Sequence, residues 1–414
     1  MGAWNEGPFC LVLGGGGAKG VYHIGVWRAL RELGIDVDAF IGTSIGALIA
    51  GFLAQGAEEE LEEIGRTITV DDILALPPEL TENGEVKLDF ESLAGIRELF
   101  RNAMARKGLD TSPLKLLLAD RLDEEAIRRD GKDLGIVTVN LAGLEPREVF
   151  IEEMERGSLV EYLLASAAFP GFERPRIAGK EYTDGGLYDN VPYAMARRRG
   201  YRRIIVSDVS GAGRNRHPQV EGSLTAYIKN SVEMGGVLDF SRPFLDSFNL
   251  LGYLDAMRAF GRLVGHSYFV EPDPAAEAAF EPPRGPAPEF PEYMRHDRRG
   301  LLMRLECAAS VLGVERVRRY TYATLEEAVR SRADEVAQRV EAARGRSGGI
   351  LGLASQFREA IAARRLEERP LFYHRLVGEV VPGAPGALLT KALVALHPEL
   401  PAGAAFIDAL CDAE

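Results

Sequence analysis

The sequence predicts an α/β fold built on a largely parallel sheet. Apolar runs of strand length alternate with segments of helical period through the first half of the 414 residues, which is the pattern of consecutive βαβ units. A glycine-rich turn follows the first apolar run, and a short motif of glycines around a serine follows the second. Both motifs stand where a strand passes into a helix.

The predicted elements follow one another in chain order. An apolar run predicts the first strand at 9–13, and helical periodicity predicts the first helix at 21–33. The second strand and helix are predicted at 39–42 and 45–54. Glycine and alanine recur along this second helix at intervals of about one turn, so we expect its backbone to pack closely on the sheet. Further strands are expected at 136–140, 148–152, 203–209 and 268–271.

The rest of the chain is divided by its composition. Seven of the 22 residues from 271 to 292 are prolines, which marks a linker or an irregular segment. We therefore expect an α/β domain over residues 8–273, a proline-rich linker over 274–292 and a helical region of unknown role over 293–414.

Three helices are expected in the C-terminal region, at 301–312, 324–343 and 353–366. A capping box formed by Thr324 and Glu327 would open the second of them. One apolar stripe on this helix is expected to pack against the first domain. The stripe consists of Leu325, Val329, Val336 and Val340.

The net charge of −13, from 49 basic and 62 acidic side chains, disfavours nucleic acid as a partner. Arginine clusters within 197–203 and 295–299 leave a membrane-facing patch open as the alternative to solvated helix faces. Neither a signal peptide nor a membrane span is indicated, so we expect a cytoplasmic protein whose membrane contact is at most peripheral. The oligomeric state is not indicated. Three scattered cysteines, expected to be reduced thiols, are Cys10, Cys307 and Cys411.

The first motif is the glycine-rich turn within residues 11–20. Such a turn presents several backbone N–H groups at a helix N-terminus, where they can bind a negative oxygen. Its glycine register also matches the dinucleotide fingerprint, but the second strand does not end in the acidic residue that a dinucleotide fold requires. A phosphate loop is disfavoured as well, because Lys19 is followed by Gly20 rather than by Ser or Thr.

The second motif, Gly42-Thr43-Ser44-Ile45-Gly46, is a G-x-S-x-G sequence between a strand and a helix. In that context it predicts a nucleophile elbow, a sharp turn that exposes the serine hydroxyl. The sequence therefore predicts Ser44 as a catalytic nucleophile.

A candidate base for Ser44 is Asp184, which precedes Gly185 and Gly186 and can lie in a tight turn. Taken alone, an Asp-Gly pair is more often a structural turn. Asp189 and Asp208 are rival bases, which we expect to be structural because acids at strand ends usually cap the next turn.

A Ser-His-Asp triad is the alternative to this pair. His217 and His266 follow the acid in the chain, as an α/β-hydrolase would require. Such an enzyme has several strands before its elbow, however, whereas Ser44 follows only the second predicted strand, so the α/β-hydrolase triad is disfavoured. His23 is expected to be a packed or capped residue, and the remaining histidines are His296, His374 and His397.

Together the motifs resemble those of the patatin-like phospholipase family. Their order and separations fit that family over about residues 8–210, and segments 166–170 and 190–192 resemble it too. The resemblance implies a three-layer patatin-like fold with a mostly parallel central sheet. The C-terminal 140 or so residues carry no such resemblance. The matching motif residues are Gly15-Gly16-Gly17-Ala18-Lys19-Gly20, Gly42-Thr43-Ser44-Ile45-Gly46 and Asp184-Gly185-Gly186.

The resemblance further implies a lipid acyl hydrolase of the phospholipase A or lysophospholipase type that needs neither metal nor cofactor. Ser44 would attack the acyl ester and Asp184 would take its proton. Lys19 would fix the loop or face an acidic neighbour. The alternative is a catalytically idle patatin fold that binds lipid or a protein partner. The implied oxyanion hole is formed by backbone amides from Gly15, Gly16, Gly17 and Ala18.

The connection over residues 58–132 is far longer than an ordinary loop, so we expect it to hold helices, and it leaves room for a lid. Its apolar segment 73–80 has two open interpretations. Either the segment is buried, or it forms an exposed rim that takes an acyl chain from a lipid aggregate. Leu74 and Leu76 are the residues that distinguish the two.

Overall fold

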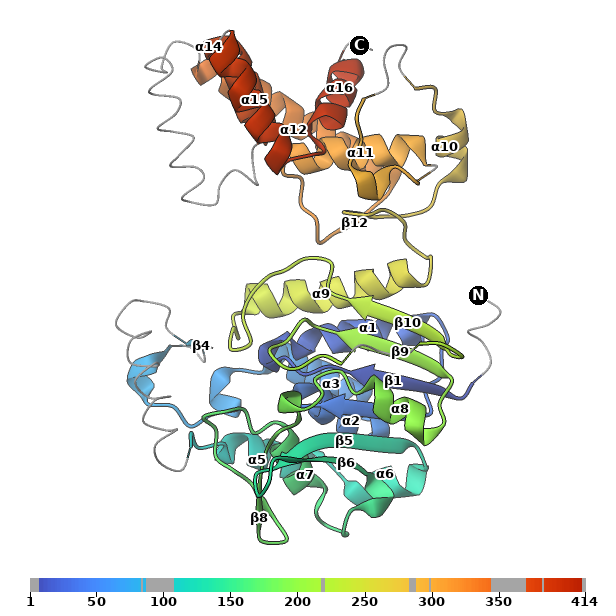
Figure 1. Cartoon of the computed structure of the whole chain (residues 1–414), viewed down its shortest axis with the longest axis vertical. Coiled ribbons are helices and arrows are strands. Elements are labelled where there is room, and N and C mark those ends of the chain that lie inside the picture. The colour runs from blue at the N-terminus through green and yellow to red at the C-terminus, as the bar shows by residue number, and fades with distance from the viewer. Residues whose placement is uncertain are drawn as a thin grey trace. The chain divides into compact units, whose positions relative to one another are not determined.

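The computed structural model describes residues 7–82, 85–86, 108–216, 220–282, 288–297, 299–343, 370–381 and 383–411. The chain divides into two compact units, Met1–Phe260 and Gly261–Glu414 (Figure 1). The sequence-based boundaries at 273 and 293 remain predictions.

The first unit is built on one eight-stranded sheet, of which seven strands follow the order β10-β9-β1-β2-β5-β8-β7, while β6 also pairs with β5. The strands from β10 to β5 are parallel to their neighbours, and β6, β7 and β8 pair antiparallel. The predicted α/β fold with a mostly parallel sheet is therefore confirmed. The strands are β1 Phe9–Leu13, β2 Ala39–Thr43, β5 Asp133–Asn140, β6 Glu145–Phe150, β7 Arg176–Ile177, β8 Lys180–Asp184, β9 Arg203–Asp208 and β10 Leu224–Lys229.

Helices cover both faces of this sheet, which gives it three layers (Figure 1). On one face, alternate residues of β1 such as Cys10 and Val12 share a buried cluster with Met195 of α8. On the other face, the ring of Trp27 in α1 meets that of Phe40 in β2 at 5.5 Å between centroids. The helices are α1 Val21–Glu32, α2 Ile45–Gln55, α3 Glu58–Thr67, α5 Ser112–Arg121, α6 Glu124–Asp130, α7 Leu159–Ser166, α8 Tyr193–Arg199 and α9 Arg242–Ala259.

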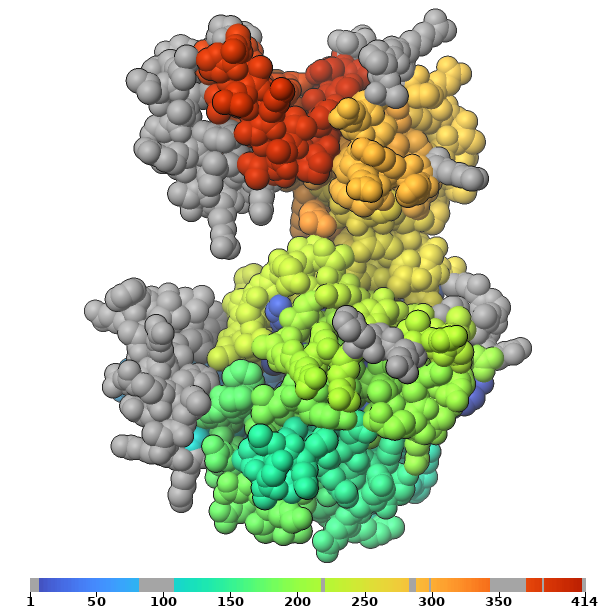
Figure 2. All heavy atoms as spheres, viewed as in Figure 1, coloured from blue at the N-terminus to red at the C-terminus, as the bar shows by residue number. Residues whose placement is uncertain are grey.

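The central strand β1 places the glycine-rich turn. All five of its residues are buried. On the face of the molecule that Figure 2 shows, little of the blue N-terminal part is visible. At the end of β1, Leu13 pairs with Gly42 of β2 and with Ser207 of β9. Three parallel strands therefore end together, and the loops that follow them meet at one edge of the sheet.

The predicted strands and helices of the first 55 residues are confirmed within one residue. Two other predictions need correction. The strand expected at 148–152 is β6, which ends at Phe150 because a 3₁₀ turn over Ile151–Glu153 follows. The strand expected at 268–271 is β11, Phe269–Val270, which pairs with β12, Arg319–Tyr320, in the second unit and not with the central sheet.

The second unit packs helices around its own apolar core. The predicted helix at 301–312 is confirmed as α11, whereas the one predicted at 353–366 lies outside the described residues. The helices of the second unit are α10 Pro274–Ala279, α11 Gly300–Val311, α12 Tyr322–Ala343, α14 Pro370–Val380, α15 Ala384–Leu396 and α16 Leu400–Cys411. The first unit also contains a short hairpin of β3 Thr81–Glu82 and β4 Glu85–Val86.

The helix predicted at 324–343 begins earlier, at Tyr322. Its first turn is held by Thr321 and not by the predicted pair of Thr324 and Glu327. The amide of Thr324 donates to Oγ1 of Thr321 over 3.1 Å, and the amide of Thr321 donates to Oγ1 of Thr324 over 2.9 Å. The capping box was thus predicted one turn too late, because two Ser/Thr residues three apart both fit the N-cap pattern.

The apolar stripe of α12 is buried, but its predicted partner is wrong. Leu325, Val329, Val336 and Val340 belong to the core of the second unit. There they share one buried cluster with residues of α11, α14 and α16. Helical periodicity shows that one face of a helix is buried, but it does not show which element covers that face.

Among the described helices, none is by itself both long and apolar enough to cross a bilayer. The helices α15 and α16 reach that length and composition only when counted together, and they are bent by 102° relative to each other.

Candidate active site

Ser44 lies in a sharp turn between β2 and α2, with φ 55° and ψ −128°. A positive φ is uncommon and strained for a residue with a side chain, and it is the conformation that a nucleophile elbow requires. The flanking glycines are needed for space. A Cβ atom on Gly46 would lie 2.3 Å from the carbonyl oxygen of Leu13, and one on Gly42 would lie 2.2 Å from the carbonyl oxygen of Gly46.

Asp184 lies within hydrogen-bonding distance of the serine. Ser44 Oγ donates to Asp184 Oδ2 over 2.7 Å, and the amide of Gly186 donates to Asp184 Oδ1 over 2.7 Å. Asp184 is at the end of β8, opposite Thr138 of β5, which is the neighbour of β2 in the sheet. The pairing of these strands brings together two residues that are 140 positions apart in the chain.

The Asp184 carboxyl group is only 5% exposed. Burial raises its pKa from the ordinary 3.8 to about 6, against the opposing effect of the hydrogen bonds from Gly186 and Ser44. At neutral pH the group is therefore mostly ionised, yet it is a much stronger base than a carboxylate in water.

The glycine-rich turn lies directly beside Ser44, since a Cβ atom on Gly15 would be 3.1 Å from Cβ of Ser44. Two of its amides already have acceptors. Gly15 N donates to the carbonyl of Asn190 over 3.0 Å, and Ala18 N donates to the carbonyl of Val237 over 2.9 Å. The amides of Gly16 and Gly17 have no acceptor among the described residues.

The other predicted motif residues support this arrangement by close packing. A Cβ atom on Gly20 would lie 2.2 Å from Ile45, and one on Gly185 would lie 2.2 Å from the carbonyl oxygen of Val137. Lys19 is 7% exposed. Its Nζ lies 3.6 Å from Oε2 of Glu233, an acidic neighbour that stands mostly in solvent.

The rival bases have other partners. Asp208 accepts hydrogen bonds from the hydroxyl of Tyr227 and the amide of Ser210, each over 2.8 Å. Asp189 accepts from the amide of Val191 over 3.4 Å, and burial raises its pKa to about 6 as well. Neither of these carboxylates is hydrogen-bonded to Ser44 in the described structure.

No histidine of the described residues is hydrogen-bonded to Ser44. His23 is fully buried, and its two ring nitrogens bond Ser207 Oγ and the carbonyl of Gly14. His266 pairs with Asp297 over 3.2 Å inside the second unit, and His217 lies outside the described residues.

Two residues to which the sequence assigned no role hold the site together. Ser166 Oγ accepts the amide of Ser44 over 2.9 Å and donates to the carbonyl of Val137 over 2.6 Å, so it ties the elbow to β5. Asn190 contacts the glycine-rich turn. Both residues stand in segments that resemble the patatin-like family, which was the available signal, but their partners depend on the tertiary structure.

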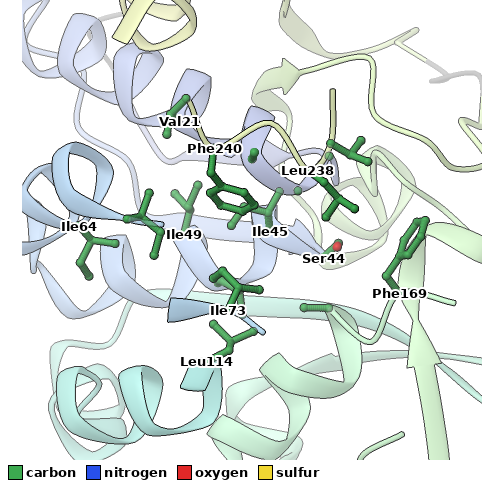
Figure 3. A pocket seen from close by; sticks show the side chains of 18 of the residues that line it. Val21, Ser44, Ile45, Ile49, Ile64, Ile73, Leu114, Phe169, Leu238 and Phe240 are labelled. Carbon is green, nitrogen blue, oxygen red and sulfur yellow. The ribbon is translucent and has the colours of Figure 1, made fainter. Parts of the chain in front are cut away.

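An apolar cavity of about 150 Å³ opens beside Ser44. Figure 3 shows Ser44 at one side of its lining and Ile64 at the other. Apart from the Ser44, Asp184 and Asn190 side chains, the wall is hydrocarbon and glycine backbone. Its apolar side chains include Ile45, Leu48, Ile49 and Phe52 of α2, Leu61 and Ile64 of α3, Leu114, Leu117 and Leu118 of α5, and Ile73, Phe169, Leu238 and Phe240 from loops.

The apolar segment 73–80 contributes to this wall through Ile73. Leu74 is 2% exposed and is part of the core, whereas Leu76 is half-buried. For Leu74 the buried interpretation is therefore the right one. Residues 83–84 and 87–107 of the same connection lie outside the described residues.

Metal-ligand clusters of three or more His, Cys, Asp or Glu side chains do not occur in the part of the chain that the structure describes.

Residues 11–197 match the family model of the patatin-like phospholipases. Among curated proteins, "Patatin-like phospholipase domain-containing protein 6" of Mus musculus is 30% identical over 206 residues, which are 48% of this chain and 13% of that protein. An uncharacterized NTE family protein of Mycobacterium tuberculosis is 30% identical over 186 residues, 44% of each chain. "Lysophospholipase NTE1" of Cryptococcus neoformans is 29% identical over 200 residues, 48% of this chain and 11% of that protein.

The chain thus spans less than half the length of these relatives. Among solved structures, VipD from Legionella pneumophila aligns with a TM-score of 0.39 and 13% identity over 96% of this chain and 88% of VipD.

Proposed function

Since residues 11–197 belong to the patatin-like phospholipase family, we propose that this chain is a lipid acyl hydrolase of the phospholipase A or lysophospholipase type. The observation that carries the proposal is the 2.7 Å hydrogen bond from Ser44 Oγ to the buried carboxylate of Asp184. The serine hydroxyl can therefore pass its proton directly to Asp184, without a histidine between the two side chains.

In the proposed reaction, Ser44 Oγ attacks the carbonyl carbon of the acyl ester while its proton passes to Asp184 Oδ2. The amides of Gly16 and Gly17 donate to the oxyanion of the tetrahedral intermediate. Collapse of the intermediate breaks the ester bond, and the leaving alcohol takes the proton from Asp184. A water molecule then attacks the acyl-serine while Asp184 takes its proton. Collapse of this second intermediate releases the fatty acid, and the proton returns from Asp184 to Ser44 Oγ.

The amides of Gly15 and Ala18 are not part of this proposal, because both donate to protein carbonyls. The oxyanion hole proposed from the sequence is thereby narrowed from four residues to two.

A digest of a mixed lipid extract, followed by mass spectrometry, tests the proposed activity. We expect free fatty acids and singly deacylated lipids to accumulate with the wild type. If no ester in the mixture is cleaved, and a fluorophosphonate does not label the protein either, the chain is the catalytically idle lipid- or partner-binding form instead. The same experiment with intact vesicles tests the expected peripheral contact with membranes.

The apolar cavity supports an acyl chain as the group bound next to Ser44. We expect Ile64→Trp to shorten the chain that is accepted, because Ile64 lies across the cavity from Ser44 (Figure 3) and indole is much larger than its side chain. The specificity constant kcat/KM for a p-nitrophenyl palmitate should fall about tenfold or more, the cost of about 1.4 kcal/mol of lost contact. The value for the butyrate should stay within about twofold.

Leu250→Trp is the matched control for this substitution, since Leu250 is exposed on α9 and does not line the cavity. It should leave the ratio of the two specificity constants unchanged. Equal losses on both esters with Ile64→Trp would place the acyl chain elsewhere.

The pH dependence of kcat/KM should follow the ionisation of Asp184, because only the carboxylate form can accept the serine proton. Burial raises the pKa of this carboxyl group to about 6, so activity should rise with pH, pass its midpoint near 6 and level off above about 7. Below the midpoint, kcat/KM should fall about tenfold for each pH unit.

Asp189 is the control for this profile, since its pKa is also raised to about 6 and it does not contact Ser44. In Asp189→Asn the midpoint should stay near 6. If the midpoint disappears in this variant, the titrating group is Asp189 and not Asp184.

A further inference from the structure

Asn190 binds both backbone groups of Gly15. Its carbonyl accepts the amide of Gly15 over 3.0 Å, and its side-chain Nδ2 donates to the carbonyl of Gly15 over 3.2 Å. Asn190 is 1% exposed, and its own amide donates to the carbonyl of Arg214 over 2.9 Å. The backbone of this buried residue is therefore held by Arg214 as well as by the glycine-rich turn.

The bond to the carbonyl of Gly15 sets the direction of the next amide. The C=O group of Gly15 and the N–H group of Gly16 belong to one peptide unit, which is planar and trans, so they point in opposite directions. A partner that holds the carbonyl also holds the N–H group. The amide of Gly16 is one of the two that have no acceptor among the described residues, and it is the one whose orientation Nδ2 of Asn190 controls.

The preceding peptide unit is held separately by His23. Nε2 of His23 lies 2.8 Å from the carbonyl oxygen of Gly14. A carbonyl can only accept, so Nε2 carries the hydrogen and Nδ1 accepts the hydroxyl hydrogen of Ser207 over 2.7 Å. Burial lowers the pKa of His23 to about 4, which keeps the ring neutral in this arrangement.

The Gly15–Gly16 peptide would otherwise be free to rotate. Glycine adopts both signs of φ at similar cost, so a peptide unit between two glycines can flip unless a neighbour holds it. The side chain of Asn190 also packs against this unit, because a Cβ atom on Gly15 would lie 2.5 Å from its Oδ1. Among the described residues, Asn190 supplies the hydrogen bond to the carbonyl of this peptide.

We propose that Asn190 is the positioning residue of the oxyanion hole, holding the Gly15–Gly16 peptide so that the Gly16 amide points toward the acyl oxygen. The inference rests on the proposed hydrolase function. Removing one oxyanion donor typically lowers kcat by about 10²–10³-fold. When Asn190 no longer orients the Gly16 amide, kcat should fall by part of this factor.

The test compares a transition-state analogue with a ground-state analogue. An alkyl trifluoromethyl ketone forms a tetrahedral adduct with Ser44 Oγ, and its oxyanion needs the hole. An ether of the same chain length fills only the acyl cavity. In Asn190→Ala, kcat and the affinity for the ketone should fall together by about 10–100-fold, while KM and the affinity for the ether stay within about twofold.

Asn190→Asp retains the size of the side chain but replaces the donor with an acceptor, so it should show the same selective loss. Asn140→Ala is the matched control. Asn140 is likewise buried and bonds the backbone, accepting the amide of Ala142 over 3.0 Å, but it lies away from the glycine-rich turn. It should lower the melting temperature without changing the ratio of ketone to ether affinity.

Each possible result has one meaning. A wild-type value of kcat in Asn190→Ala and Asn190→Asp overturns the inference. Parallel losses of ketone and ether affinity with a lower melting temperature overturn it too, because they show a structural role alone. If the wild type itself shows no hydrolysis that depends on Ser44, the proposed function has failed and not the role of Asn190 within it.

Discussion

Ser44→Ala should lower kcat/KM for a short p-nitrophenyl ester by about 10⁴-fold or more, because the covalent step depends on the hydroxyl group that it removes. The fold should stay intact. Alanine lacks only the hydroxyl oxygen of serine, and the backbone amide of residue 44 can still donate its hydrogen bond to Oγ of Ser166. The measurement is single-substrate kinetics beside thermal unfolding of both proteins.

Fluorophosphonate labelling provides an independent readout for the same variant. The wild type should be labelled at Ser44, and the label should be absent from Ser44→Ala. Ser207 serves as an internal control, because it is fully buried and the probe cannot reach its hydroxyl group. A variant that retains more than about a tenth of wild-type activity would exclude Ser44 as the nucleophile.

Asp184→Asn should cause a comparable loss of activity and at the same time a higher melting temperature. The amide group retains the shape of the carboxylate but cannot take the proton of Ser44. Stability should rise because the ionised form of Asp184 is unfavourable in its buried position, which is the reason that its pKa is raised from 3.8 to about 6. With about 1.4 kcal/mol for a tenfold change in acidity, the penalty at neutral pH is about 3 kcal/mol.

The sign of the pH effect follows from which state binds the proton more tightly. Between pH 3.8 and about 6 the folded protein holds the proton on Asp184 and the unfolded chain releases it, so stability falls as the pH rises through this range. Above about pH 6 the full penalty is present. The melting temperature of Asp184→Asn should therefore exceed that of the wild type by several degrees at pH 8, and the difference should vanish near pH 4.

Asp208→Asn is the control for both effects, because Asp208 is a buried carboxylate that bonds Tyr227 and not Ser44. Activity should persist in this variant. If Asp184→Asn is inactive and also less stable than the wild type, Asp184 has a structural role and another group is the base.

The elements that the sequence predicted well are those with a strong local pattern. Strand β1 is a continuous apolar run and was placed to the residue, and α2 follows from small residues at helical spacing. Strand β8 was missed, although it carries Asp184. It reads Lys-Glu-Tyr-Thr-Asp, in which only the tyrosine is apolar in character, so it has too few apolar positions for a strand pattern.

The site shows the same limit. The elbow at Ser44 could be predicted because its motif lies within five residues and its geometry needs only local space. The partner of Ser44 was identified from a family resemblance, since 140 residues separate it from Asp184. The hydrogen bonds of Ser166 and Asn190 also join distant segments, 122 and 175 positions apart. A local sequence pattern does not indicate which distant residues come into contact.

The place of β1 in the sheet also determines when during synthesis the site can form. The two neighbours of β1 are β2 and β9, and β9 ends at Asp208. Parallel pairing over such a distance closes a long loop and is slow. Until the ribosome has released β9, one edge of β1 is unpaired and Gly14 lacks its Ser207 partner. After Ser44, some 160 further residues must therefore be synthesised before β1 has both neighbours and the site of the proposed hydrolase can form.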